Sequence, residues 1–115
     1  MAKKTEKYLE IIIKAIEEKK GVDLQVFDLR NREETSFDYA IICTGNSNVQ
    51  IRAIKDSLRE TLTAKKLKRF SDTGRFESNW LILDYGAYII HILGPEERRF
   101  YHLEDLWKDA GVIYH

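Results

Sequence analysis

The sequence predicts a single mixed α/β domain, and two observations carry this prediction. A length of 115 residues lies in the usual range for one domain. Two stretches repeat apolar residues at helical spacing, whereas several short apolar runs are typical of strands. Because the helical stretches alternate with groups of strands, we expect one mixed sheet flanked by helices over residues 1–115.

The first part of the chain predicts a helix followed by two strands. The helix covers about 6–20, with Thr5 as its N-cap and Gly21 as a left-handed C-terminal stop. A strand over 24–29 and a second strand over 39–44 follow. The second strand is apolar nearly throughout, so we expect both of its faces to be covered.

A second helix opens the rest of the chain. It spans about 49–64, and its spacing predicts that Val49, Leu58, Leu62 and either Ala53 or Ile54 face inward. The elements expected after it are a short edge strand over 67–70, a polar loop over 71–79, strands over 80–84 and 87–93, and a helical segment over 96–107 that opens after Pro95.

The strands over 80–84 and 87–93 predict an antiparallel hairpin with Tyr85-Gly86 as its two-residue connection. In that register Asp84 lies opposite Ala87, and Trp80 lies opposite His91. Alternation then gives a mixed face and a uniformly apolar one. The mixed face holds Trp80, Ile82, Asp84, Ile89 and His91, and the apolar face holds Leu81, Leu83, Tyr88, Ile90 and Ile92.

The apolar face is typical of core, whereas the mixed face has two open interpretations. In one, it binds a partner and Trp80 is an anchor, since aromatic and charged residues dominate interface hot spots. In the other, a helix covers it and Trp80 is a large core residue. On geometry alone the two carry equal weight. The segment after Pro95, which includes Arg98 and Tyr101, is richer in aromatics and arginines than a capping helix requires.

Charge, hydropathy and cysteine content argue against several classes of protein. Lys plus Arg and Asp plus Glu each number 19, so no bulk charge favours nucleic acid or an anionic membrane. The apolar runs are far shorter than the roughly 20 residues that span a bilayer. Cys43 lies in an apolar strand and suits a small core residue. The N-terminus has no signal-peptide pattern, so we expect a reducing, bacterial cytoplasm.

The turn from Thr44 to Asn48 joins an expected strand to an expected helix, a position where proteins often bind phosphate. It has neither the lysine of a P-loop nor the further glycines of a dinucleotide fingerprint. A nucleotidyltransferase needs two strand carboxylates one residue apart for Mg²⁺, and no Asp or Glu pair stands at i and i+2. The three histidines, His91, His102 and His115, share no metal-binding spacing. We therefore interpret the turn from Gly45 to Asn48 as a helix cap. We expect the protein to have no metal site, no cofactor and no catalytic residues.

A basic run follows the second helix, at Lys65, Lys66, Lys68 and Arg69. Such a run is usually a solvated helix end, where lysines also suit the macrodipole. Its alternative is contact with a phosphate backbone, although it lacks the interleaved aromatics that stack bases.

Three ordered motifs resemble one known family. They are Trp80-Leu81-Ile82-Leu83-Asp84-Tyr85-Gly86, then Ile89-Ile90-His91-Ile92, then Pro95-Glu96-Glu97-Arg98-Arg99-Phe100-Tyr101-His102-Leu103-Glu104-Asp105-Leu106-Trp107. Asp38-Tyr39 and the stretch from Thr44 to Gln50 agree with the same family. The chain is thereby identified as resembling the ribosomal silencing factor family (RsfS, also called Iojap), over nearly its full length.

The resemblance implies a binding protein with a nucleotidyltransferase-like sheet that lacks the metal carboxylates. It implies attachment to the large ribosomal subunit through ribosomal protein L-fourteen, a steric block to joining of the small subunit, and lower translation when nutrients are scarce. It also implies a homodimer when free, and rRNA contact that is at most peripheral, through the basic run. Carried over by motif, the partner-binding residues are Trp80, Asp84, Tyr85, His91, Arg98 and Tyr101.

The sequence departs from the family pattern in three places. Thr73-Gly74 stands where the family usually has Glu-Gly, Leu93-Gly94 replaces a Phe-containing strand end, and the loop from Arg75 to Asn79 is individual to this sequence. These positions affect the edge of the expected interface. Two other function classes stay open: a small nucleotidyltransferase-like enzyme that uses the turn from Gly45 to Asn48, and a scaffold whose exposed sheet face pairs with its own copy.

Overall fold

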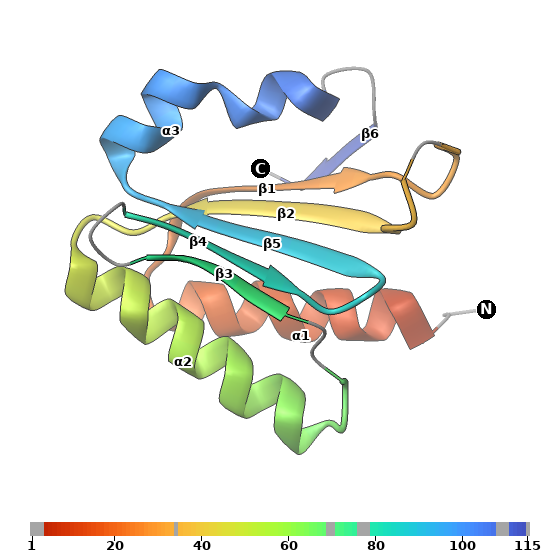
Figure 1. The fold of residues 1–115 in the computed structure, drawn as a ribbon. Coiled ribbons are helices and arrows are strands. Elements are labelled where there is room, and N and C mark those ends of the chain that lie inside the picture. The colour runs from red at the N-terminus through yellow and green to blue at the C-terminus, as the bar shows by residue number, and fades with distance from the viewer. Residues whose placement is uncertain (1–3, 34, 69–70, 76–78, 108–110, 115) are drawn as a thin grey trace.

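A computed structural model describes residues 4–33, 35–68, 71–75, 79–107 and 111–114. They form one mixed sheet with the strand order β3-β4-β5-β2-β1-β6 and helices on both faces (Figure 1). The elements are α1 (Lys4–Glu18), β1 (Val22–Asp28), β2 (Tyr39–Thr44), α2 (Asn48–Ala64), β3 (Ser71–Arg75), β4 (Trp80–Asp84), β5 (Tyr88–Leu93), α3 (Pro95–Tyr101), the 3-10 helix η2 (Leu103–Trp107) and β6 (Gly111–Tyr114). The predicted fold class is confirmed.

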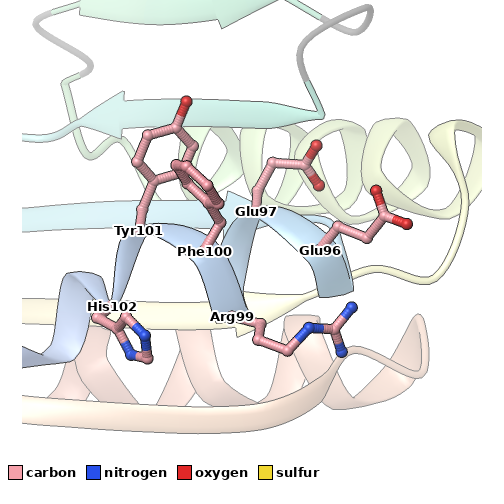
Figure 2. A pocket seen from close by; sticks show the side chains of 6 residues that line it. All are labelled: Glu96, Glu97, Arg99, Phe100, Tyr101 and His102. Carbon is pink, nitrogen blue, oxygen red and sulfur yellow. The ribbon is translucent and has the colours of Figure 1, made fainter.

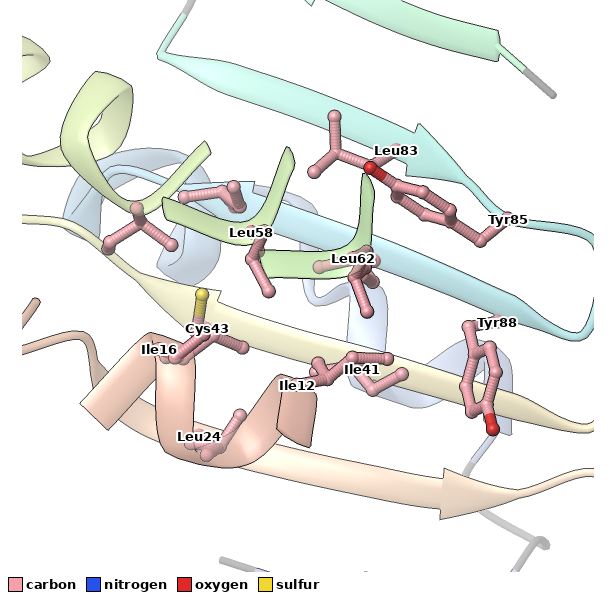
Figure 3. Packing of buried hydrophobic residues seen from close by; sticks show 14 of the residues in the cluster. Ile12, Ile16, Leu24, Ile41, Cys43, Leu58, Leu62, Leu83, Tyr85 and Tyr88 are labelled. Carbon is pink, nitrogen blue, oxygen red and sulfur yellow. The ribbon is translucent and has the colours of Figure 1, made fainter. Parts of the chain in front are cut away.

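The two faces of the sheet carry different layers. Helices α1 and α2 cover one face, and the shorter pair α3 and η2 lies on the other (Figure 1). Strands β2 and β5, which pair in parallel at the centre, are buried at every position because both faces are covered. The main core lies under α1 and α2, where Ile12, Leu58 and Ile41 meet (Figure 3).

The β4–β5 hairpin has the predicted faces but a different register. Asp84 pairs with Ile89 rather than Ala87, and the turn is centred on Gly86, whose φ is 82°. Ala87 N–H donates to the Tyr85 carbonyl across this turn (3.0 Å), a conformation that glycine adopts without strain. The slip amounts to two positions along the partner strand. Because side chains alternate with a period of two, every residue stays on its predicted face.

Both long helices differ from prediction in detail. Helix α1 begins at Lys4, so Thr5 lies inside it, and the left-handed residue at its end is Lys20 (φ 63°) rather than Gly21. Gly21 is instead needed for packing, because a Cβ there would lie 2.6 Å from Ile16 Cγ2. In α2, Val49 is exposed; the first inward position is Ile51, two residues later.

The segments outside the central strands were harder to predict. The edge strand is β3, a few residues after the predicted 67–70, of which 69 and 70 lie outside the described residues. The predicted helix over 96–107 is two pieces, since His102 adopts φ 46° and ends α3. Strand β6, absent from the prediction, pairs with β1 at the other edge.

Candidate partner-binding surface

Trp80 and His91 form a fixed pair on the face of the sheet under α3. Trp80 begins β4 and pairs with Leu93 of β5, and His91 pairs with Ile82, so the Trp80 and His91 side chains are diagonal neighbours. The indole Nε1–H donates to His91 Nδ1 at 3.1 Å. An accepting Nδ1 must be unprotonated, which fixes a neutral imidazole. Burial lowers the pKa of His91 from 6.5 to about 4, in agreement with that bond.

The α3–η2 segment extends this pair into a row of aromatic rings. The Tyr101 ring lies 4.9 Å from that of Trp80, and Phe100 meets Tyr101 edge-on at 5.1 Å. On the other side, Trp107 lies 5.8 Å from His91. Such separations are those of favourable aromatic pairs. The row therefore connects the interior of the face to the surface of α3.

The outer end of the row is exposed. Phe100 is 77% exposed and Tyr101 is 55% exposed, whereas Trp80 is half-buried. We call Trp80, Phe100 and Tyr101 the aromatic surface. Beside it lies an open hollow of ≈ 690 Å³ lined by Glu96, Glu97, Arg99, Phe100, Tyr101 and His102 (Figure 2). Exposed aromatics of this kind are typical of protein interfaces.

Arg98 points inward and fastens α3 to the sheet. Its Nε donates to Glu104 Oε2 (3.0 Å), its Nη1 to Thr44 Oγ1 (3.0 Å) and its Nη2 to Gln25 Oε1 (3.3 Å). Only 10% of the side chain is exposed. The guanidinium thus joins α3, η2, β2 and β1 at one point, and we call it the Arg98 clamp.

The six residues predicted to bind a partner therefore separate into groups. Trp80, His91 and Tyr101 come together. Asp84 shares their face but lies at the far end of β4, where its Oδ1 accepts from Gly86 N–H (2.9 Å). Tyr85 is buried in the main core on the opposite face (Figure 3), and Arg98 forms the clamp. Phe100 was not among the six predicted residues. The sequence signal that could have identified it is its position next to Tyr101 in the aromatic segment after Pro95.

The covered-face interpretation is correct for the inner part of the mixed face. Ile89 and His91 are buried beneath the α3–η2 segment, and Ile82 packs against the same cluster. Trp80 contributes to this cluster and also borders the exposed rings. The inner part of the face is therefore core, and partner binding at its exposed edge stays a prediction.

The turn after β2 is occupied by its own hydrogen bonds. Gly45 N–H donates to the Leu93 carbonyl (2.9 Å), Asn46 N–H to Gln50 Oε1 (2.6 Å), and Gln50 N–H to Ser47 Oγ (3.1 Å). Ser47 is the N-cap of α2, as its sequence position favoured. In the described ranges, no group of three or more His, Cys, Asp or Glu side chains is placed to hold a metal ion.

The remaining predicted features lie away from the aromatic surface. Lys65, Lys66 and Lys68 are exposed at the end of α2, in the layer opposite α3 (Figure 1), and Arg69 falls outside the described residues. Cys43 is fully buried, and burial raises the pKa of its thiol to about 12. None of the described helices has the length and apolarity to cross a membrane.

Comparison with known proteins agrees with this architecture. A Chromobacterium violaceum protein of known crystal structure superposes with a TM-score of 0.85 at 26% identity, over 92% of this chain and 88% of that one. The ribosomal silencing factor RsfS of Haemophilus influenzae is 32% identical over 86% of this chain and 96% of its own length. RsfS of Bacillus subtilis is 30% identical over 90% of this chain and 87% of its own. The maize chloroplast protein Iojap is 31% identical over 89% of this chain and 44% of its own length.

The similarity extends over the whole fold. Residues 2–114, from the start of the chain through β6, match the family described as ribosomal silencing factor during starvation. On this match and on the identity to the Haemophilus protein, the chain belongs to the RsfS family of ribosomal silencing factors.

Proposed function

We propose that this protein lowers translation by docking on the large ribosomal subunit through ribosomal protein L-fourteen, where its body keeps the small subunit from joining. Membership of the RsfS family supports silencing at the ribosome. The observation that carries the docking site is the exposed aromatic surface, because Phe100 and Tyr101 leave apolar area open beside the half-buried Trp80. A stable complex would cover roughly 600 to 1,000 Å² on each partner.

The mechanism is steric and requires no chemistry from the protein. The relatives are named as silencing factors, and two backbone amides of the turn from Gly45 to Asn48, those of Gly45 and Asn46, already donate to acceptors within the protein. We therefore propose a binding protein rather than an enzyme, acting in the cytoplasm. Titration calorimetry with nucleotide and Mg²⁺ tests this point, since clear micromolar binding would favour the nucleotidyltransferase-like alternative.

We propose that the free protein and the ribosome-bound protein have different partners. The free protein is proposed to be a homodimer, and binding to the large subunit replaces the second copy. Lys65, Lys66 and Lys68 make at most a peripheral contact with rRNA, because they lie in the layer opposite α3. Sedimentation at several concentrations, with and without large subunits, measures the exchange; a dimer that persists on the subunit would contradict it.

The docking site is tested with Tyr101→Ala. We expect it to weaken binding to purified L-fourteen by about 2 kcal/mol, roughly thirtyfold, if Tyr101 is a hot spot. Because more than half of its side chain is exposed, the fold should remain stable. The matched control is Val49→Ala, an exposed apolar residue (79%) on α2, in the layer away from α3. Equal affinities for the two variants would place the docking site elsewhere.

A further inference from the structure

We propose that the outer side of α3 receives an arginine side chain of a protein partner, held between the rings of Phe100 and Tyr101 and the carboxylates of Glu96 and Glu97. This inference deepens the proposed function and rests on it for the identity of the partner. The recognition chemistry itself rests on α3 alone.

The spacing of the helix brings rings and carboxylates together. Glu96 precedes Phe100 by four residues, and Glu97 precedes Tyr101 by four, so each carboxylate lies one turn from a ring on the same side of the helix. In Figure 2, both carboxylates share the side of α3 that carries the rings, whereas Arg99 and His102 leave from the other side. The ring side is therefore negative.

The two carboxylates and the outer ring are available to a partner. Phe100 is 77% exposed, and within the part of the chain described here neither Glu96 nor Glu97 takes part in a salt bridge. Arg98 of α3 does not face this side, because its guanidinium donates to Glu104 and Thr44 in the Arg98 clamp. The ring side thus lacks a cation of its own.

Arginine fits this arrangement better than any other side chain. Its planar guanidinium stacks on an aromatic face and donates to carboxylates from its edge at the same time. A lysine ammonium forms the ion pair without the stacking, and a purely apolar side chain leaves both carboxylates facing it unpaired. Charge complementarity therefore selects a basic partner surface at this site.

The chemistry is tested first without the ribosome. An octa-arginine peptide is titrated into the full chain, and NMR follows the ring protons of Phe100 and Tyr101 together with the backbone amides of the whole chain. We expect their signals to shift, and the shift to fall about fivefold or more in Glu96→Gln/Glu97→Gln. The single variant Glu96→Gln guards against a folding effect of Glu97, whose Oε1 lies against Gly94. Shifts confined to other acidic surfaces, such as Asp56 and Glu60 on α2, or no shifts, would overturn the inference.

The same variants are then compared on purified large subunits. We expect Glu96→Gln/Glu97→Gln to bind about fivefold more weakly at low salt and to lose much of the salt dependence. The matched control is Glu60→Gln, which removes an exposed carboxylate of α2 in the other layer and should leave the affinity unchanged. Wild-type binding equal to that of the double variant would contradict the inference while leaving the proposed function intact. Absence of wild-type binding would contradict the proposed function, and the peptide titration would still decide the chemistry.

Discussion

His91 makes the stability of the domain depend on pH in a direction fixed by its bond to Trp80. The imidazole is buried and accepts the indole N–H at Nδ1, so protonation removes the acceptor and places a charge inside the face. The folded-state pKa of about 4 is below the ordinary 6.5 of the unfolded chain. Between these values the unfolded state binds a proton that the folded state does not, and stability falls as the pH falls.

The size of the effect follows from the two pKa values. Their difference corresponds to about 3 kcal/mol, of which about 2 kcal/mol is lost between about pH 7 and about pH 4.5. The variant His91→Gln has an oxygen acceptor and does not titrate. We expect it to be less stable than wild type near neutrality but to lose about 2 kcal/mol less on acidification. Carboxylates such as Asp28, whose pKa is lowered by its hydrogen bond to Arg30, contribute equally to both proteins and cancel.

Urea unfolding followed by tryptophan fluorescence measures the difference, since Trp80 and Trp107 both contact His91. The control is Val49→Ala, an exposed change on α2 that removes no titratable group and should leave the pH slope unchanged. The reasoning is refuted if wild type and His91→Gln lose the same free energy of unfolding on acidification.

Three further changes probe the contacts that position the surface. Arg98→Ala should cost about 2 kcal/mol of stability, since it breaks the clamp and leaves Glu104 without its cation, whereas Arg99→Ala should cost under about 0.5 kcal/mol; thermal unfolding compares them. Gln50→Ala removes the side chain that accepts from Asn46 N–H and donates to the carbonyls just after α1, and we expect a loss of about 1 to 2 kcal/mol in urea, with the exposed α2 change Val49→Ala as reference. Gly86→Ala must adopt φ near 82° and should cost about 1 kcal/mol or more by the same assay; no loss would contradict the turn geometry.

The centre of the sheet was predictable because its signals are local. The apolar run of β2 gives its bounds without error, and the alternation in β4 and β5 assigns the faces even though the turn lies one residue later than predicted. The register error is harmless for a physical reason: a shift by an even number preserves the side-chain alternation. Helix ends were less predictable, because Lys20 takes the left-handed conformation next to a glycine better suited to it.

The candidate site depended on contacts that no local pattern encodes. Arg98 reaches Thr44 and Gln25, which lie 54 and 73 residues away in the sequence, so its inward orientation could not be read from a helix rich in charge. Tyr85 stands beside Asp84 in the motif, yet alternation sends it into the main core. Strand β6 has only four residues and is stabilised by pairing with β1, far earlier in the chain.

The central claim is that docking on the large subunit blocks subunit joining. It is tested most directly by co-sedimenting the protein with purified large subunits and then adding small subunits, with light scattering to follow the formation of whole ribosomes. The account predicts that wild type binds and suppresses joining in proportion to occupancy, while Tyr101→Ala suppresses it only at much higher concentration. Whole ribosomes forming at full rate on large subunits saturated with wild-type protein would contradict it.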